Sequence, residues 1–145
     1  MSKLVLDTGE DFPEAAARHL DDATALQSEG RHDNAAYLSG YVVECVLKTV
    51  IRIEMEGHPE VHDLTALSRR ASGLAALPGA QTARHAASMS ASTHRLYEYG
   101  EKGWSESMRY RPSGHVPDDV AAEWLDEAEK VYDRVVGSLR LDGVV

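Results

Sequence analysis

Hydrophobic residues recur at helical spacing along most of the chain. Between Asp11 and Glu29 they return every three or four positions with charged residues between them, which predicts an amphipathic helix that stops at Gly30. The next stretch, Asn34–Met55, carries hydrophobic residues on nearly every face. We therefore expect a long helix that other helices enclose, with Asp33 or Asn34 as its N-cap.

The rest of the chain predicts shorter helices, a loop and a final helix. A short helix follows its expected cap, Asp63, and another is expected over Ala80–Tyr99. Residues Gly100–Pro117 combine turn residues with two large aromatics, which is typical of a loop that packs against a core. A regular apolar stripe then runs to Leu139 and predicts the last helix. These elements predict an all-α fold, an up-and-down bundle of four to five helices.

Length and composition indicate one soluble domain. A chain of 145 residues, 43% hydrophobic and 27% charged, has enough apolar sequence for one core. We expect a single domain over residues 1–145, with residues 1–9 and 142–145 flexible. No apolar run approaches the roughly 18 residues of a membrane span, and the first residues lack a signal-peptide pattern. These features predict a cytoplasmic protein without a membrane partner.

Net charge and the positions of the Cys, His and Asp residues limit the kinds of functional site that the chain can form. A formal charge of -9 argues against a protein that coats duplex nucleic acid, but it permits a local basic site. Cys45 lies in the most apolar stretch, which predicts a buried thiol and not a nucleophile. His58, His62 and Asp63 could hold a metal ion, but a loop that caps the next helix explains them better. We expect no metal and no cofactor.

Glu44 and Lys48 are the charged residues of the otherwise uncharged interior from Ala35 to Ile51. Their spacing of four residues predicts an ion pair on one face of a helix, at the edge of the bundle. The alternative is functional: the two side chains line a polar cleft or a dimer interface.

The segment before the last helix concentrates residues that bind phosphate. It contains Trp104, Arg109, Tyr110, Arg111 and His115. Arginines and an imidazole beside a helix N-terminus suit a phosphate or nucleotide, and metal-free RNA cleavage needs the same groups, a base and a cation. The structural alternative is that the two aromatic residues close the end of the bundle while Arg109 pairs with a nearby acid.

Four segments of the chain resemble the HEPN family, and they follow one another along the chain in the same order as in that family. Residues 34–48, NAAYLSGYVVECVLK, resemble its second helix, and residues 17–23, ARHLDDA, precede a Gly-Arg turn as in its first helix. His62-Asp63-Leu64-x-x-Leu67 follows the second helix, and Trp104 with Arg109-Tyr110 precedes the last one. Together the segments cover the chain from about residue 15 to residue 137.

The resemblance implies a helical bundle that forms a homodimer and works in a toxin–antitoxin or phage-defence system, often with a small nucleotidyltransferase as partner. Catalytic members are metal-independent endoribonucleases with an arginine, four to six residues, and a histidine. Arg109 and His115, with five residues between them, match this spacing. They are the expected catalytic pair, and Trp104, Tyr110 and Arg111 are expected to join Arg109 in binding RNA or a nucleotide. A non-catalytic nucleotide-binding or nucleotidyltransferase-partner module, or a helical scaffold without a ligand site, remains open.

Overall fold

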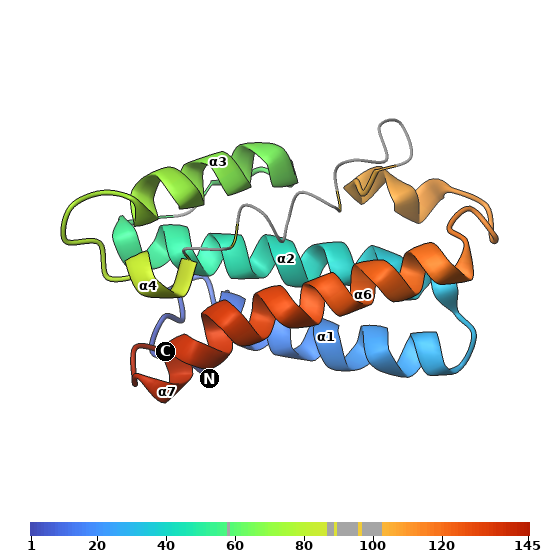
Figure 1. The fold of residues 1–145 in the computed structure, drawn as a ribbon, viewed down its shortest axis with the longest axis horizontal. Coiled ribbons are helices and arrows are strands. Elements are labelled where there is room, and N and C mark those ends of the chain that lie inside the picture. The colour runs from blue at the N-terminus through green and yellow to red at the C-terminus, as the bar shows by residue number, and fades with distance from the viewer. Residues whose placement is uncertain (58, 87–88, 90–95, 97–102) are drawn as a thin grey trace.

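The protein is an all-α bundle, as the hydrophobic pattern predicts. The computed structural model describes residues 1–57, 59–86, 89, 96 and 103–145, and within these ranges it contains helices and turns but no strand. Three long helices lie side by side (Figure 1), and a shorter one packs against the second of them along the chain. The helices are α1 (Phe12–Ser28), α2 (His32–Glu54), α3 (Leu64–Ala75), α4 (Ala83–Ala86), the 3₁₀ helix η2 (Glu106–Tyr110), α6 (Asp118–Tyr132) and α7 (Ser138–Leu141).

Helix α2 is the centre of the bundle. It contacts α1, α3, α6 and η2, and every residue from Val42 to Ile51 is buried. A helix that is apolar all round must be covered on all sides, because exposed apolar surface costs free energy in water. The prediction that the central stretch is an enclosed helix is confirmed.

The turn between α1 and α2 departs from the prediction in one respect. Gly30 ends the first helix with a φ of 74°, a backbone conformation that glycine adopts without strain. Helix α2 then begins at His32 with Arg31 at the N-cap, and no side chain caps it. The prediction that Asp33 or Asn34 is the cap is wrong, because the Asp33 carboxylate accepts hydrogen bonds from another segment of the chain.

The last helix has the predicted length and the predicted buried stripe. Its core-facing residues include Trp124, Val131 and Leu139, each at most 1% exposed. Between α6 and α7 the chain stays helical through a π-helical turn over Asp133–Gly137. The apolar stripe therefore continues across this turn and packs α6 against α2 and α1.

Two further features complete the fold. Helix α4 represents the start of the helix expected over residues 80–99, and the rest of that helix lies outside the described residues apart from Met89 and Leu96, which are buried.

The two chain termini lie at the same end of the molecule (Figure 1), where Lys3 Nζ donates to the carbonyl oxygen of Gly143 at 2.6 Å. The predicted flexibility of residues 1–9 and 142–145 stays a prediction. Among the described helices, none combines the length and the apolar composition needed to cross a bilayer.

Candidate functional site

Trp104 packs against α2 and holds the segment that carries the candidate site in place. The indole is 7% exposed, and its Nε1 donates to the carbonyl oxygen of Tyr37 at 2.8 Å. The ring lies directly over Gly40, where even a Cβ atom would come within 1.9 Å of Nε1. Its packing against Tyr37 and Tyr41, at ring-centroid distances of 6.4 and 5.2 Å, completes an aromatic cluster. The start of η2 is therefore held in a fixed position over the first half of α2.

Arg109 lies at the exposed end of η2. Its guanidinium lies 5.0 Å from the centroid of the Tyr110 ring, and Tyr110 is 78% exposed. The phenol groups of Tyr110 and Tyr37 raise the pKa of Arg109, so the guanidinium stays charged. The Tyr37 hydroxyl is itself 3.2 Å from the Tyr41 hydroxyl. The structural alternative is wrong for Tyr110, which is too exposed to close the bundle end. An ion pair of Arg109 with a nearby acid stays a prediction: Arg109 forms none within the described residues, and Glu98 and Glu101 lie outside them.

Asp33, in the first turn of α2, holds the loop that carries His115. Its two carboxylate oxygens accept hydrogen bonds from the backbone N–H groups of Gly114, at 2.7 Å, and Val116, at 2.8 Å. Burial alone would raise the pKa of Asp33, but the N–H groups of Val116, Gly114 and His115 outweigh it and lower the pKa. His115 sits between the two anchored residues and is partly buried.

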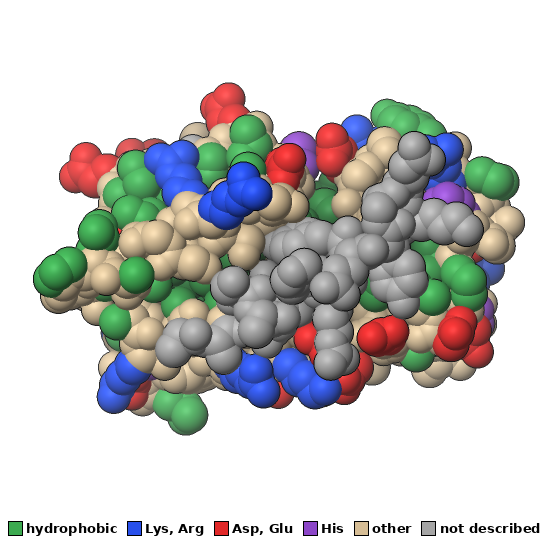
Figure 2. Space-filling model, turned by 45° about the horizontal axis from the view of Figure 1, so that its top comes forward, with side chains coloured by type: hydrophobic (Ala, Val, Ile, Leu, Met, Phe, Trp, Pro, Cys, Tyr) green, Lys and Arg blue, Asp and Glu red, His purple; other side chains and the backbone are tan. Residues whose placement is uncertain are grey.

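Arg109 and His115 meet at one cavity of about 390 Å³ between the start of α2 and the η2 loop, here called the basic hollow. Its charged lining residues are Arg31, Asp33, Arg109 and Arg111, and His115 also lines it. None of the three arginines forms an ion pair with any described residue, and the carboxylate is occupied by backbone N–H groups. Figure 2 shows basic and histidine side chains at the upper right of the view, with acidic side chains below them. The hollow therefore concentrates positive charge in a chain whose net charge is -9.

We expect Asp33→Ala to loosen the His115 loop without unfolding the protein. Loss of two partly exposed hydrogen bonds to a carboxylate should lower the free energy of unfolding by about 1 kcal/mol at neutral pH. The folded-state pKa of Asp33 is lower than its unfolded value, so its contribution is present above about pH 4 and is lost as the pH falls through the folded-state pKa. Denaturant melts of wild type and variant should therefore converge at acid pH. Asp21→Ala, an exposed carboxylate on α1, is the control and should show no such convergence.

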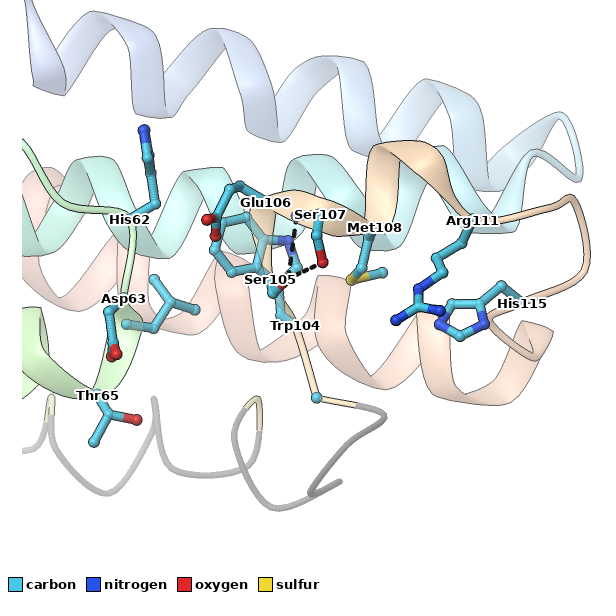
Figure 3. A pocket seen from close by; sticks show the side chains of 12 residues that line it. His62, Asp63, Thr65, Trp104, Ser105, Glu106, Ser107, Met108, Arg111 and His115 are labelled. Atoms are coloured by element: carbon cyan, nitrogen blue, oxygen red, sulfur yellow. Dashed lines mark hydrogen bonds between the residues drawn. The ribbon is translucent and has the colours of Figure 1, made fainter.

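A second cavity of about 390 Å³, here called the polar hollow, adjoins the basic hollow. The two cavities share Met108, Arg111 and His115 as lining residues. Figure 3 shows His62, Asp63 and Thr65 on one side of the polar hollow. The other side comes from the segment around η2 and includes Trp104, Ser105, Glu106 and Ser107.

Glu44 and Lys48 form the predicted ion pair, at 2.9 Å, and both side chains are buried. The structure adds a third member, because Nδ1 of His62 lies 3.0 Å from both carboxylate oxygens of Glu44. The Lys48 ammonium also lies 5.6 Å from the centroid of the Phe12 ring. This cluster ties the segment before α3 to α2. Its member His62 lines the polar hollow, whereas Glu44 and Lys48 line neither hollow. A role of Glu44 and Lys48 in a polar cleft or dimer interface stays a prediction.

Of the other candidate residues, Cys45 and Asp63 do not contribute a nucleophile or a metal site in the described part of the chain. Burial raises the pKa of the Cys45 thiol to about 12, as expected of a core cysteine. Asp63 caps α3 by accepting a hydrogen bond from the Ala66 N–H at 2.9 Å, as predicted. His58 lies outside the described residues, and within those residues no three His, Cys, Asp or Glu side chains gather as a metal site would require.

Sequence reasoning missed three residues of the site. Arg31, Asp33 and Tyr37 all belong to the turn before α2 or to its first turns, far along the sequence from the segment they contact. Helical spacing reports which residues share a face, but it does not report which loop covers that face. The available signal was Arg31, a cation in the Gly-Arg turn directly before the central helix.

Comparison with known protein families gives one match. The HEPN domain model matches residues 10–139, from the residue before the α1 cap into α7. No curated protein and no solved structure matches the chain. The matched range contains every described helix from α1 to α6 and both hollows. This chain is therefore a member of the HEPN domain family.

Proposed function

We propose that the basic hollow binds the phosphate backbone of RNA and that the protein is a metal-independent endoribonuclease. One observation carries the proposal: three arginines without ion-pair partners in the described part of the chain surround one cavity with a histidine. Arginines are normally paired or solvated singly on an acidic protein, and their gathering at one cavity favours an anionic ligand. Tyr110, exposed beside Arg109, adds a ring face on which a base can stack.

The groups at the hollow match the chemistry of RNA cleavage. The 2′-oxygen attacks the adjacent phosphorus, the bond to the 5′-oxygen breaks, and a 2′,3′-cyclic phosphate forms. Arg109 has a planar fork that can hold two phosphate oxygens while negative charge grows on the phosphorane. His115 is the group that takes the proton from the 2′-hydroxyl or gives one to the departing 5′-oxygen.

The reaction needs a base and an acid together, and a homodimer would supply both. In the proposed arrangement two copies bring their Arg109 and His115 residues to one cleft, which would also double the local positive charge. Membership of the HEPN family favours a dimer, whereas the apolar residues of α2 are already buried within one chain and add no support. A cytoplasmic toxin–antitoxin or phage-defence system, with a small nucleotidyltransferase as possible partner, is the biological setting that we propose.

A non-catalytic module that holds a nucleotide or a partner nucleotidyltransferase is the second candidate. The observation in its favour is the position of Arg109, whose guanidinium is already engaged with the phenol groups of Tyr110 and Tyr37. A guanidinium held in this way can bind an anionic ligand, and binding alone requires no proton transfer. A measurement of RNA cleavage separates the two candidates.

We expect the purified protein to cut labelled single-stranded RNA in the presence of EDTA and to leave 2′,3′-cyclic phosphate ends. His115→Ala should lower the rate by about 10²–10⁴-fold, the usual contribution of a general acid or base, while RNA affinity changes little. His32→Ala is the matched control, because His32 does not line the hollow. Equal rates for wild type and His115→Ala would contradict a catalytic histidine. Binding without any cleavage by the wild type would favour the non-catalytic module.

A further inference from the structure

The two hollows lie next to each other and share a wall. Met108, Arg111 and His115 line both cavities, so a ligand that extends past these residues would reach both. Figure 3 shows Arg111 and His115 together at one end of the polar hollow, with His62, Asp63 and Thr65 away from them. A ligand bound at the basic hollow therefore has a second cavity available next to the phosphate-binding groups.

The chemistry changes from one hollow to the other. Beyond the shared wall, the polar hollow is lined by two carboxylates and three hydroxyls, from Asp63, Glu106, Thr65, Ser105 and Ser107. A nucleotide has the complementary distribution, with an anionic phosphate at one end and a base rich in N–H donors at the other. A volume of about 390 Å³ also lies in the range of small-molecule sites, roughly 300–1,000 Å³.

Glu106 is the carboxylate that remains available for a ligand. One oxygen of Asp63 already accepts the Ala66 N–H as the cap of α3. Glu106 is partly buried in the first turn of η2, lines the polar hollow, and forms no hydrogen bond or ion pair with a described residue. The neighbouring Ser105 and Ser107 hydroxyls bond to each other at 2.6 Å, which fixes the hydroxyl groups beside it (Figure 3).

We propose that the polar hollow is a nucleobase subsite that prefers guanine, with Glu106 as the specificity-determining residue. The inference rests on the proposed function, because the phosphate of the same nucleotide occupies the basic hollow. Guanine alone among the four RNA bases presents two adjacent N–H donors, N1–H and the 2-amino group, on its Watson–Crick edge. A carboxylate accepts both at once, whereas adenine, cytosine and uracil place at least one acceptor opposite it.

Titration calorimetry with nucleoside 3′-phosphates tests the subsite. The wild type should bind guanosine 3′-phosphate about tenfold more tightly than the adenosine, uridine or inosine compound, a difference of about 1.4 kcal/mol that a bidentate pair can supply. Inosine is the sharpest comparison, because it differs from guanosine only by the missing 2-amino group. Glu106→Gln should remove the preference and leave the affinity for the adenosine compound and for inorganic phosphate unchanged. Glu129→Gln, an exposed carboxylate on α6, should retain the preference.

The remaining outcomes separate this inference from the proposed function. Equal wild-type affinity for all four nucleotides, together with loss of binding in Arg109→Lys, would overturn the guanine subsite and leave the phosphate site intact. A guanine preference that survives in Glu106→Gln would also overturn the role of Glu106. Failure of all four nucleotides to bind, or affinities that do not change in Arg109→Lys, would overturn the phosphate site as well. Because Glu106 forms no hydrogen bond or ion pair with a described residue, we expect an unchanged melting temperature for Glu106→Gln.

Discussion

Val46→Asp is expected to leave the chain unfolded at room temperature. Val46 is fully buried at the centre of α2, among the residues that α1, α3 and α6 enclose. A carboxylate at this position would have neither solvent nor a partner, at a cost of several kcal/mol, and the valine methyl groups would be lost from the core. The total stability of a domain of this size is about 5–15 kcal/mol, so the substitution removes much or all of it. Far-ultraviolet circular dichroism with a thermal melt measures the effect.

Val61→Asp provides the matched control. Val61 is 43% exposed in the segment before α3, so the same change of side chain should shift the melting temperature little. A folded Val46→Asp variant with a wild-type melting temperature would contradict the enclosed position of α2. Equal destabilisation by both substitutions would show that the effect does not depend on burial.

Gly40→Ala is expected to be the second most damaging substitution, although it adds one methyl group. The new Cβ would lie 1.9 Å from Nε1 of Trp104, so the indole must leave its seat on α2. The protein then loses the 2.8 Å hydrogen bond to the Tyr37 carbonyl and part of the burial of the largest side chain in the η2 segment. We expect a loss of about 2–4 kcal/mol in the free energy of unfolding, measured by urea titration.

Gly73→Ala is the control for this prediction. Gly73 also lies within a helix, α3, but nothing comes within 4 Å of a Cβ placed there. Alanine is the better helix former at an open position, so this variant should be more stable than wild type by about 0.5–1 kcal/mol. Stabilisation by both substitutions would contradict the close packing of Trp104 on α2. Opposite signs for the two glycines would confirm it.

Because burial follows hydrophobic periodicity, the helices were predictable from sequence. The enclosed α2 and the striped α6 have the strongest patterns and were predicted within a few residues of their ends. The N-cap of α2 was mispredicted because the partners of Asp33 lie 81 and 83 residues away, and local spacing carries no information about them. Residues whose role depends on a distant loop are the ones that periodicity cannot assign.

The candidate site was predictable in part for the same reason. Arg109 and His115 are close in sequence, and both line the basic hollow as their loop position indicated. Arg31, which completes the positive lining, comes from the opposite side of the cavity and becomes visible only when the chain is folded. Likewise, the spacing of Glu44 and Lys48 predicted their ion pair but not the contact of Glu44 with His62, which is 18 residues away.

The RNA affinity and melting temperature of Arg109→Lys, measured side by side, test most directly whether the basic hollow binds phosphate. Lysine keeps the charge but loses the two-pronged fork, so we expect RNA affinity to fall about tenfold at fixed salt. The melting temperature should stay unchanged, because the Arg109 side chain is exposed. Arg69→Lys, on the exposed face of α3, should change neither quantity. Wild-type RNA affinity combined with a lower melting temperature would show that Arg109 stabilises the fold and does not bind the ligand.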